Sequence, residues 1–201
     1  MNSRIAAVVL AAGLSRRMGT PKMVLPWGET TVIGRVVSVL TQAGIEEVLV
    51  ITGGARQQVE VALQGMPARV AFNPRFAEDH MTLSLQVGLA ALPADVEAAL
   101  VTLGDQPQIE PAVVQAILQA YFEKRSSLVV PSYQHHRGHP WLIARELWKD
   151  VFALHTPQTL REFLNAHAGQ IDYLPVENAS VIRDLDTRED YERDRPAPSA
   201  G

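Results

Sequence analysis

Residues 9–22 read VLAAGLSRRMGTPK, and this stretch decides the fold of the chain. The residues just before it, 5–10, form a continuous apolar run that predicts a buried parallel strand. The stretch therefore leaves the carboxyl end of a strand, which is where open α/β sheets bind their ligands. We expect the loop after this strand to hold the ligand.

This loop combines small residues with fixed cations. Residues 11–13 are Ala-Ala-Gly, so backbone N–H groups can approach a base or a phosphate closely. Arg16, Arg17 and Lys22 add permanent positive charge, with Arg suited to bidentate phosphate contacts. The combination favours a nucleoside triphosphate, although an ordinary strand-to-helix loop with solvated basic residues is the alternative.

Two familiar phosphate-binding loops do not match. No Gly-x-x-x-x-Gly-Lys-Ser/Thr string occurs in the chain, which excludes a P-loop. A dinucleotide fingerprint needs three spaced glycines and an acidic residue at the end of the second strand. Here the second strand ends Val50-Ile51-Thr52-Gly53, without an acid, so a dehydrogenase is disfavoured.

The composition favours a single α/β enzyme domain. The chain has 201 residues, with 18 Lys plus Arg against 22 Asp plus Glu and a net charge of −4, so binding of nucleic acid through a basic surface is disfavoured. It has no cysteine, which excludes disulfides and thiolate metal sites and fits a cytoplasmic protein. No apolar run approaches the ~20 residues that cross a bilayer, so we expect no membrane span.

Strands and helices alternate along the chain. This alternation predicts a three-layer α/β/α sandwich around a mostly parallel, Rossmann-like sheet with a small antiparallel addition. Residues 1–194 are expected to form one domain, and residues 195–201 a disordered tail. The expected strands cover residues 5–10, 48–52, 69–72, 98–103, 128–131, 140–143 and 171–175. The expected helices cover residues 30–43, 55–64, 82–92, a segment from 111, 145–152, 158–167 and a segment after 187.

An acidic residue follows the buried strand 98–103. Asp105 should face the same crevice as the first loop, because it lies just past the carboxyl end of that strand. Mg²⁺ usually takes one or two protein carboxylates and completes its shell with water and phosphate oxygens. Asp184 or Asp186 could supply the second carboxylate, although Asp186 or Thr187 could instead cap the last helix.

The pattern Leu-Ala-Ala-Gly-x-Ser-x-Arg-Met-Gly-x-x-Lys, which starts at Leu10, resembles the signature of the molybdenum cofactor cytidylyltransferases and related nucleotidyltransferases. Further motifs follow in that family's order and carry the resemblance over about residues 4 to 191. They are Leu25-Pro26-Trp27-Gly28, Asn73-Pro74, Met81 with Ser84-Leu85, Gly104-Asp105-Gln106-Pro107, Arg137-Gly138-His139-Pro140 and Asp184-Leu185-Asp186-Thr187.

The resemblance implies a fold of the nucleotide-diphospho-sugar transferase type and a set of site residues. Arg17, Lys22 and Asp105 would be catalytic, Asp105 and Asp186 would bind Mg²⁺, and Arg137 and His139 would contact the acceptor. The nucleotide would be bound by Leu10, Ala11, Ala12, Gly13, Ser15, Arg17, Lys22, Ser84, Gly104 and Asp105.

Two positions depart from the family pattern. His80 stands where relatives usually have Gly before the Met, and Gln86 stands where an Arg is common. Both departures put the acceptor contacts in doubt. His135 and His139 have the spacing of two zinc ligands on a helix, but Gly138 and Pro140 argue against a helix there, so we expect a loop without zinc.

The predicted chemistry is transfer of a nucleotidyl group to a phosphomonoester with loss of pyrophosphate. A phosphomonoester is already largely dianionic at neutral pH, so no general base is needed. The resemblance implies CTP as donor, because guanylyl-transferring relatives generally carry Leu-Ala-Gly-Gly where this chain has Leu10-Ala11-Ala12-Gly13. It implies the molybdopterin-type cofactor as acceptor, and transient contact with a molybdenum hydroxylase or its chaperone.

Three other functions stay open. A guanylyltransferase on the same cofactor would differ mainly in the base pocket at Ala11 and Ala12. A nucleotidyltransferase acting on a sugar phosphate or phospholactate would differ near Ser84 and Arg137. A non-catalytic carrier of the pterin is disfavoured, because Lys22 and Asp105 are both retained.

Overall fold

A mixed sheet of eight strands forms the centre of the computed structural model, which describes residues 4–15 and 18–197. Its order is β10-β7-β9-β6-β1-β4-β5, and β8 pairs with β7. The strands are β1 (Arg4–Ala11), β4 (Glu47–Thr52), β5 (Arg69–Phe72), β6 (Val96–Leu103), β7 (Leu128–Tyr133), β8 (His136–Arg137), β9 (Trp141–Ala144) and β10 (Ile171–Pro175). β1 pairs in parallel with β4 and β6, whereas β9 is antiparallel to β6 and β7.

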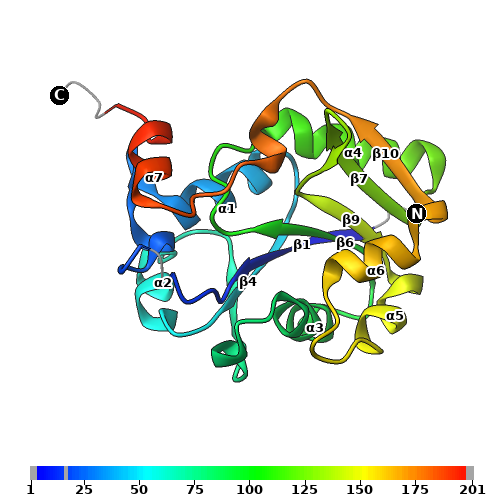
Figure 1. Cartoon of the computed structure of the whole chain (residues 1–201), viewed down its shortest axis with the longest axis horizontal. Helices are drawn as coiled ribbons and strands as arrows, with labels where there is room; N and C mark the ends of the chain where they lie inside the picture. Colours follow the sequence, from blue (N-terminus) through cyan, green and yellow to red (C-terminus); the bar gives the residue numbers. More distant parts are fainter. Residues whose placement is uncertain (1–3, 16–17, 198–201) are drawn as a thin grey trace.

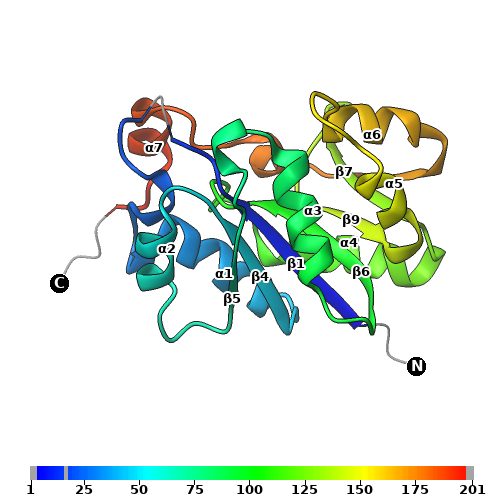
Figure 2. The same cartoon turned by 90° about the horizontal axis from the view of Figure 1, so that it is seen from below.

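Helices cover both faces of the sheet, as Figures 1 and 2 show. α1 and α4 lie on one face, and α3, α5 and α6 lie on the other. The helices are α1 (Val32–Gln42), α2 (Arg56–Ala62), α3 (Met81–Ala91), α4 (Pro111–Lys124), α5 (Trp148–Phe152), α6 (Leu160–Ala166) and α7 (Arg188–Asp194). None of the helices formed by the described residues is long and apolar enough to cross a membrane.

The residues of β1 alternate between two cores. Ala7 and Val9 pack with α1 and α4, whereas Ala6 and Val8 pack with α3, α5 and α6. All four are fully buried, which explains why the strand reads as a continuous apolar run rather than an alternating one. The sandwich thus fixes the carboxyl end of β1, from which the loop emerges.

The predicted three-layer, mostly parallel α/β fold is confirmed. The antiparallel addition is β9 and β8, and His136 and Arg137 lie in β8 rather than on a helix. A small two-stranded sheet of β2 (Pro26–Trp27) and β3 (Thr30–Thr31) was not predicted, because two-residue strands are too short to show a periodicity. The predicted tail lies partly outside the described residues.

Candidate active site

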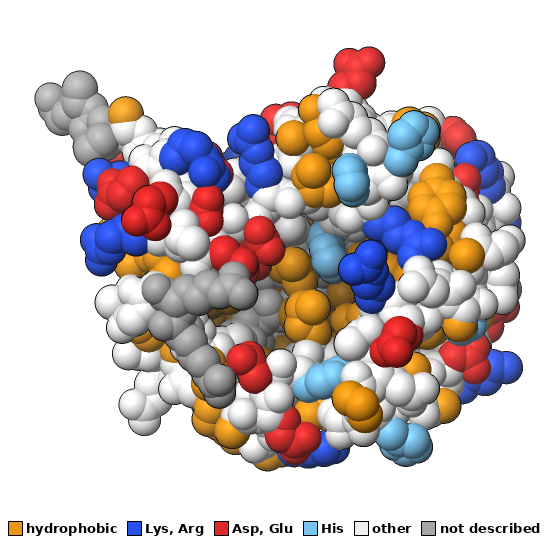
Figure 3. Space-filling model, viewed as in Figure 1, with side chains coloured by type: hydrophobic (Ala, Val, Ile, Leu, Met, Phe, Trp, Pro, Cys, Tyr) orange, Lys and Arg blue, Asp and Glu red, His pale blue; other side chains and the backbone are white. Residues whose placement is uncertain are grey.

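The first cleft lies at the carboxyl ends of β1 and β6 and has a volume of about 550 Å³. Most of the predicted nucleotide and metal residues line it together, although they come from distant parts of the chain. These are Leu10, Ala12, Gly13, Ser15, Lys22, Ser84, Asp105, Asp184 and Asp186. Figure 3 shows the hollow in this face of the molecule, with acidic side chains gathered on the side nearer α7.

Lys22 lies between two carboxylates in this cleft. Its ammonium forms an ion pair with Asp105 and donates a hydrogen bond to Oδ1 of Asp186 at 3.3 Å. Burial disfavours the charge on Lys22, but Asp105 and Asp186 outweigh that cost, and the net result is a raised pKa of Lys22. The lysine is therefore a fixed cation at neutral pH.

Asp186 lies near Asp105, which stands 81 positions earlier in the sequence, because the C-terminal segment packs on the turn after β6 and on the start of α1. The N–H of Leu185 donates to the carbonyl of Asp105 at 3.1 Å. The Leu185 side chain is fully buried in a small core with Trp27, Val32 and Tyr191. This core holds the carboxylates on either side of Leu185 at the rim of the cleft.

The cap of α7 is Thr187 and not Asp186. The Thr187 hydroxyl accepts from the N–H of Asp190, and the Asp190 carboxylate accepts from the N–H of Thr187, which together form a capping box. The N-cap is therefore Thr187, and Asp186 lines the cleft.

Asp184 is the third carboxylate at this end of the cleft. Partial loss of water, together with the negative charges of Asp186 and Asp105, raises the pKa of Asp184. Of the two late carboxylates, Asp186 is the one that shares Lys22 with Asp105. This geometry favours Asp186 over Asp184 as the partner of Asp105.

The loop after β1 is organised around Ser15. Ser15 has a positive φ of 49°, and its carbonyl accepts from the N–H groups of Met18 and Gly19. Its hydroxyl oxygen accepts from the backbone N–H of Lys22 at 3.2 Å, which fixes the start of the lysine side chain. Arg16 and Arg17 lie outside the described residues, so their predicted roles stay predictions.

Ala11 and Gly104 support the loop from behind and are not among the residues that line the cleft. The N–H of Gly104 donates to the carbonyl of Leu10 at 2.9 Å. A Cβ at position 104 would lie 3.0 Å from both the Cβ of Ala11 and the Sδ of Met23. Glycine at this position therefore allows the end of β6 to pack closely on β1 and on Met23.

Ser84 lines the cleft from α3 and is held by a residue with no predicted role. The Nδ2 of Asn73 donates to the Ser84 hydroxyl oxygen at 3.0 Å, and both side chains are buried. The Ser84 hydroxyl accepts this bond and keeps its own hydrogen as a donor. In the sequence, only the Asn73-Pro74 motif pointed to Asn73, and it gave that residue no role.

A second cleft, of about 1050 Å³, adjoins the first at Met81, which lines both. It contains the two predicted acceptor residues, Arg137 and His139. Burial lowers the pKa of His139 from 6.5 to about 4, so its ring is neutral at pH 7. Sequence reasoning did not assign Arg161, Asn165 or Tyr173, which also line this cleft.

The two departures from the family pattern tie α3 to the segment that carries α5 and α6. Gln86 donates from Nε2 to the carbonyls of Val151 and Leu154, both at 2.9 Å. The Nε2 of His80 lies 3.2 Å from the carbonyl oxygen of Pro157. Both side chains thus attach the segment that carries α5 and α6 to α3.

The residues at the Lys22 end of the first cleft fit a divalent cation. Asp105 and Asp186 both pair with the ammonium group of Lys22. Their carboxylate oxygens are therefore close enough together to face a single cation. Mg²⁺ and Mn²⁺ take oxygen ligands of this kind, with the remaining positions filled by water and phosphate. No cluster of three or more His, Cys, Asp or Glu with metal-binding geometry occurs among the described residues, so a metal here would depend on such outside ligands.

Comparison with known families now decides the class of protein. The model of the MobA-like NTP transferase domain matches residues 7–171 of the chain. The chain belongs to this family. It is a nucleotidyltransferase, and the predicted resemblance to the cytidylyltransferase group is confirmed.

Several known proteins are similar to this chain over nearly its whole length. The molybdenum cofactor cytidylyltransferase of Escherichia coli is 26% identical over 191 residues, which cover 94% of each chain. The nicotine blue oxidoreductase of Paenarthrobacter nicotinovorans is 27% identical over 202 residues, with 94% and 95% coverage. The crystal structure of Rv0371c from Mycobacterium tuberculosis superimposes with a TM-score of 0.84 at 30% identity, covering 96% of this chain and 98% of that one.

A metal is present in a related structure. A second structure of Rv0371c is a complex with manganese, with a TM-score of 0.78 and 29% identity over 95% of this chain. A divalent metal is therefore in keeping with the family, which agrees with the carboxylates of the first cleft.

Proposed function

We propose that this nucleotidyltransferase moves CMP from CTP to the phosphate of the molybdopterin-type cofactor and releases pyrophosphate. The observation that carries the proposal is Lys22 held between Asp105 and Asp186 beside the small-residue loop after β1. The family supports nucleotidyl transfer, and the Escherichia coli relative supports the choice of base and acceptor.

The first cleft would take the triphosphate. Ala12 and Gly13 leave the backbone open to the nucleotide, and Ser84 offers a hydroxyl from α3. An oxygen of the acceptor phosphate attacks the α-phosphorus, the bond from that phosphorus to the β-bridging oxygen breaks, and pyrophosphate leaves. No proton has to be removed, since the acceptor phosphate is largely dianionic at neutral pH.

The protein supplies alignment and charge neutralisation. Lys22 can turn from its carboxylate partners to the phosphates, and Arg17 is proposed to act beside it. Asp105 and Asp186 would hold Mg²⁺, which when bound neutralises charge that develops on the phosphates.

CTP is proposed over GTP because Ala12 stands where guanylyl-transferring relatives carry Gly. Guanylyl transfer to the same cofactor, and transfer to a sugar phosphate or phospholactate, are the alternatives. A cytoplasmic location, which the absence of cysteine fits, and transient contact with a molybdenum hydroxylase or its chaperone also remain predictions.

The test is incubation of the protein with each NTP, Mg²⁺ and isolated molybdenum cofactor, with pyrophosphate and the dinucleotide product measured. We expect product with CTP and much less with GTP, and Ala12→Gly should erode this preference without abolishing turnover. Equal or greater turnover with GTP would overturn the choice of base. Turnover only with another phosphomonoester would overturn the choice of acceptor.

A further inference from the structure

The second cleft is basic and contains no acid. The described residues that line it include two arginines and three histidines, and no Asp or Glu. His139 is neutral at pH 7 because burial lowers its pKa to about 4. The permanent charge of this cleft therefore comes from Arg137 and Arg161. Figure 3 shows blue and pale-blue side chains on the side of the hollow nearer α6.

Arg137 is held in place by neutral groups. Its Nε and Nη2 donate to the Tyr173 hydroxyl at 3.0 and 2.7 Å, and its Nη1 donates to Oδ1 of Asn165 at 2.6 Å. The guanidinium also lies 5.6 Å from the centre of the Tyr173 ring. None of these partners carries a negative charge, so Arg137 is positioned without being neutralised, and a guanidinium has five N–H donors of which these bonds use three.

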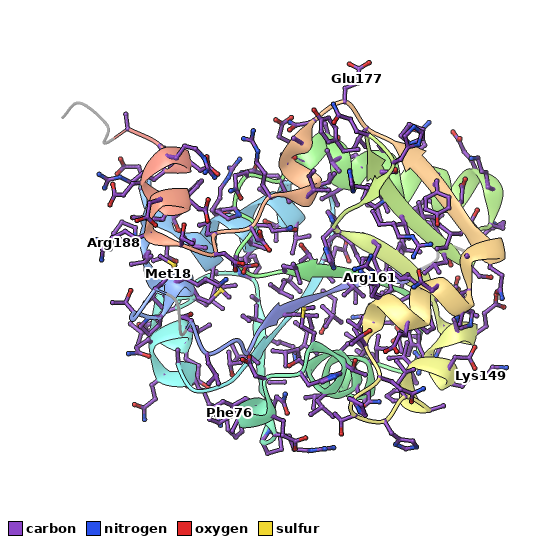
Figure 4. All side chains as sticks on the ribbon, viewed as in Figure 1. Met18, Phe76, Lys149, Arg161, Glu177 and Arg188 are labelled. Carbon is purple, nitrogen blue, oxygen red and sulfur yellow. The ribbon has the colours of Figure 1, made fainter. Side chains whose placement is uncertain are left out.

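Arg161 is on a fixed helix but its side chain is free. It is exposed and makes no hydrogen bond or ion pair with any residue that the structure describes. Its helix α6 begins with a capping box between Thr159 and Glu162. The loop before α6 is held at the start of α3 by two contacts. His80 contacts the Pro157 carbonyl, and the Thr82 hydroxyl donates to the Gln158 carbonyl. Figure 4 shows Arg161 near the middle of the view, by α6.

The two cations lie in a different cleft from the reacting groups. Lys22 and Asp105 line the first cleft, Arg137 and Arg161 line the second, and Met81 lines both. An acceptor with its phosphate at Lys22 would extend past Met81 into the second cleft. The second cleft has about twice the volume of the first, about 1050 against 550 Å³, which is room for a ring system.

We propose that Arg161 and Arg137 bind a second anionic group of the acceptor, remote from the phosphate that receives the nucleotide. Arg137 is already held in position by Tyr173 and Asn165. Arg161, on α6, would turn its side chain to bind the same group. The chain would thus select acceptors that are anionic at both ends over simple phosphomonoesters. This inference rests on the proposed transfer to an acceptor phosphate. The two tests below distinguish failure of the anion site from failure of the proposed function.

The first test needs no catalysis. The Nε–H signals of the arginines are followed by NMR while inorganic sulfate is added, with the Arg161 signal assigned from R161K. We expect the Arg161 signal to shift and saturate, and the signal of Arg188 not to follow it. Arg188 is the matched control, because it also lies in the first turn of a capped seven-residue helix and Figure 4 shows it at the left edge of the view, whereas Arg161 lies near the middle. An Arg161 signal that stays still, or that moves only in parallel with Arg188, overturns the proposal.

The second test is kinetic. R161A should raise the KM for the molybdenum cofactor about 10- to 100-fold, as expected for loss of a charge-assisted contact, while kcat and the KM for CTP stay within about twofold. R161K should recover part of the loss, and R188A should match the wild type. A normal acceptor KM in R161A overturns this inference and leaves the proposed function standing. If sulfate shifts Arg161 but no cofactor reacts, the anion site is supported and the proposed acceptor is wrong.

Discussion

The two adjoining clefts hold their charges in opposite ways. In the first, the described lining residues include four aspartates and one lysine, and the lysine is paired with two of the aspartates. In the second, two arginines face the cleft without any acid, and the one that is anchored is anchored by neutral groups. Among the described residues, the first cleft therefore carries an excess of acid that a bound metal ion would offset, whereas the second has arginines and no acid and is ready for an anion.

The largest expected effect is at the acidic end of the first cleft. Asp105→Ala removes a hard oxygen ligand and should lower turnover at least about 10²-fold, while the fold survives because the residue lies past a strand end. Asp186→Ala should act in the same direction without a capping loss, since Thr187 is the cap. Turnover is measured as pyrophosphate release at saturating CTP.

Asp95→Ala is the control for Asp105→Ala. Asp95 precedes β6 and pairs with Arg4, so it lies at the opposite end of the strand that leads to Asp105. It should leave turnover unchanged. Normal turnover in Asp105→Ala would show that the metal assignment is wrong.

The sequence predicted the first cleft better than the second, for a physical reason. Lys22 and Asp105 each follow a buried apolar strand, and parallel strands bring their carboxyl ends to one edge, so local patterns placed both residues together. Arg137, Asn165 and Tyr173 come from β8, α6 and β10, and only the tertiary fold brings them into contact. No spacing or periodicity links these three residues, so Arg161 and the partners of Arg137 could not be found from sequence.

The order of the layers was also predictable, whereas the C-terminal contacts were not. Apolar runs and helical spacing fixed the strands and helices within a few residues. Asp186 was expected either to bind metal or to cap α7, and only the structure assigns the cap to Thr187. Likewise, the bonds of His80 and Gln86 to the α5–α6 segment depend on carbonyl groups more than 60 positions away.

Loss of the loop cations should have the next largest effect. Lys22→Ala and Arg17→Ala should each lower kcat/KM for CTP by about 10- to 100-fold, because a charge-assisted phosphate contact contributes about 1.5 to 3 kcal/mol. A transition-state role should also lower kcat at saturating CTP. Lys124→Ala is the matched control, since Lys124 is likewise paired with an aspartate, at 2.8 Å, but lies on α4.

Arg16→Ala should be mild, since Arg16 occupies a variable position of the signature. If Arg16→Ala costs as much as Lys22→Ala, the loop has been aligned wrongly with the family signature. Lys22 would then act only as a counter-ion of Asp105 and Asp186.

The half-buried His139 of the second cleft should make the fold sensitive to acid. The pKa of His139 is lowered from 6.5 to about 4, so the unfolded chain binds this proton before the folded one does. The free energy of unfolding should be unaffected above pH 7 and should fall as the pH drops from 6.5 toward 4. Between pH 7 and 5 the loss due to His139 is about 2 kcal/mol.

The measurement is urea unfolding of wild type and His139→Gln at pH 7 and pH 5. The wild type should lose about 2 kcal/mol more than the variant over this interval, and comparing the two intervals removes the contribution of the other histidines. An equal loss in both proteins would mean that the His139 ring is hydrated, and that it could add charge to the second cleft at neutral pH.

The smallest expected effect tests how Arg137 is positioned. Tyr173→Phe removes the hydroxyl that accepts two hydrogen bonds from Arg137 but keeps the ring beside the guanidinium. Arg137 keeps its charge and its bond to Asn165, so the variant should lose only about 1 kcal/mol of acceptor binding, and the KM for the acceptor should rise about 3- to 10-fold with the KM for CTP unchanged. Tyr121→Phe, on α4 across the sheet, is the control and should change neither value. Because Tyr173 is proposed to act through Arg137, the same substitution should have no further effect in an Arg137→Ala background. Additive losses in the double variant would mean that the Tyr173 hydroxyl contacts the acceptor itself. The second cleft would then not contain one arginine held in position, Arg137, and one arginine that is unpaired among the described residues, Arg161, as its two anion-binding groups.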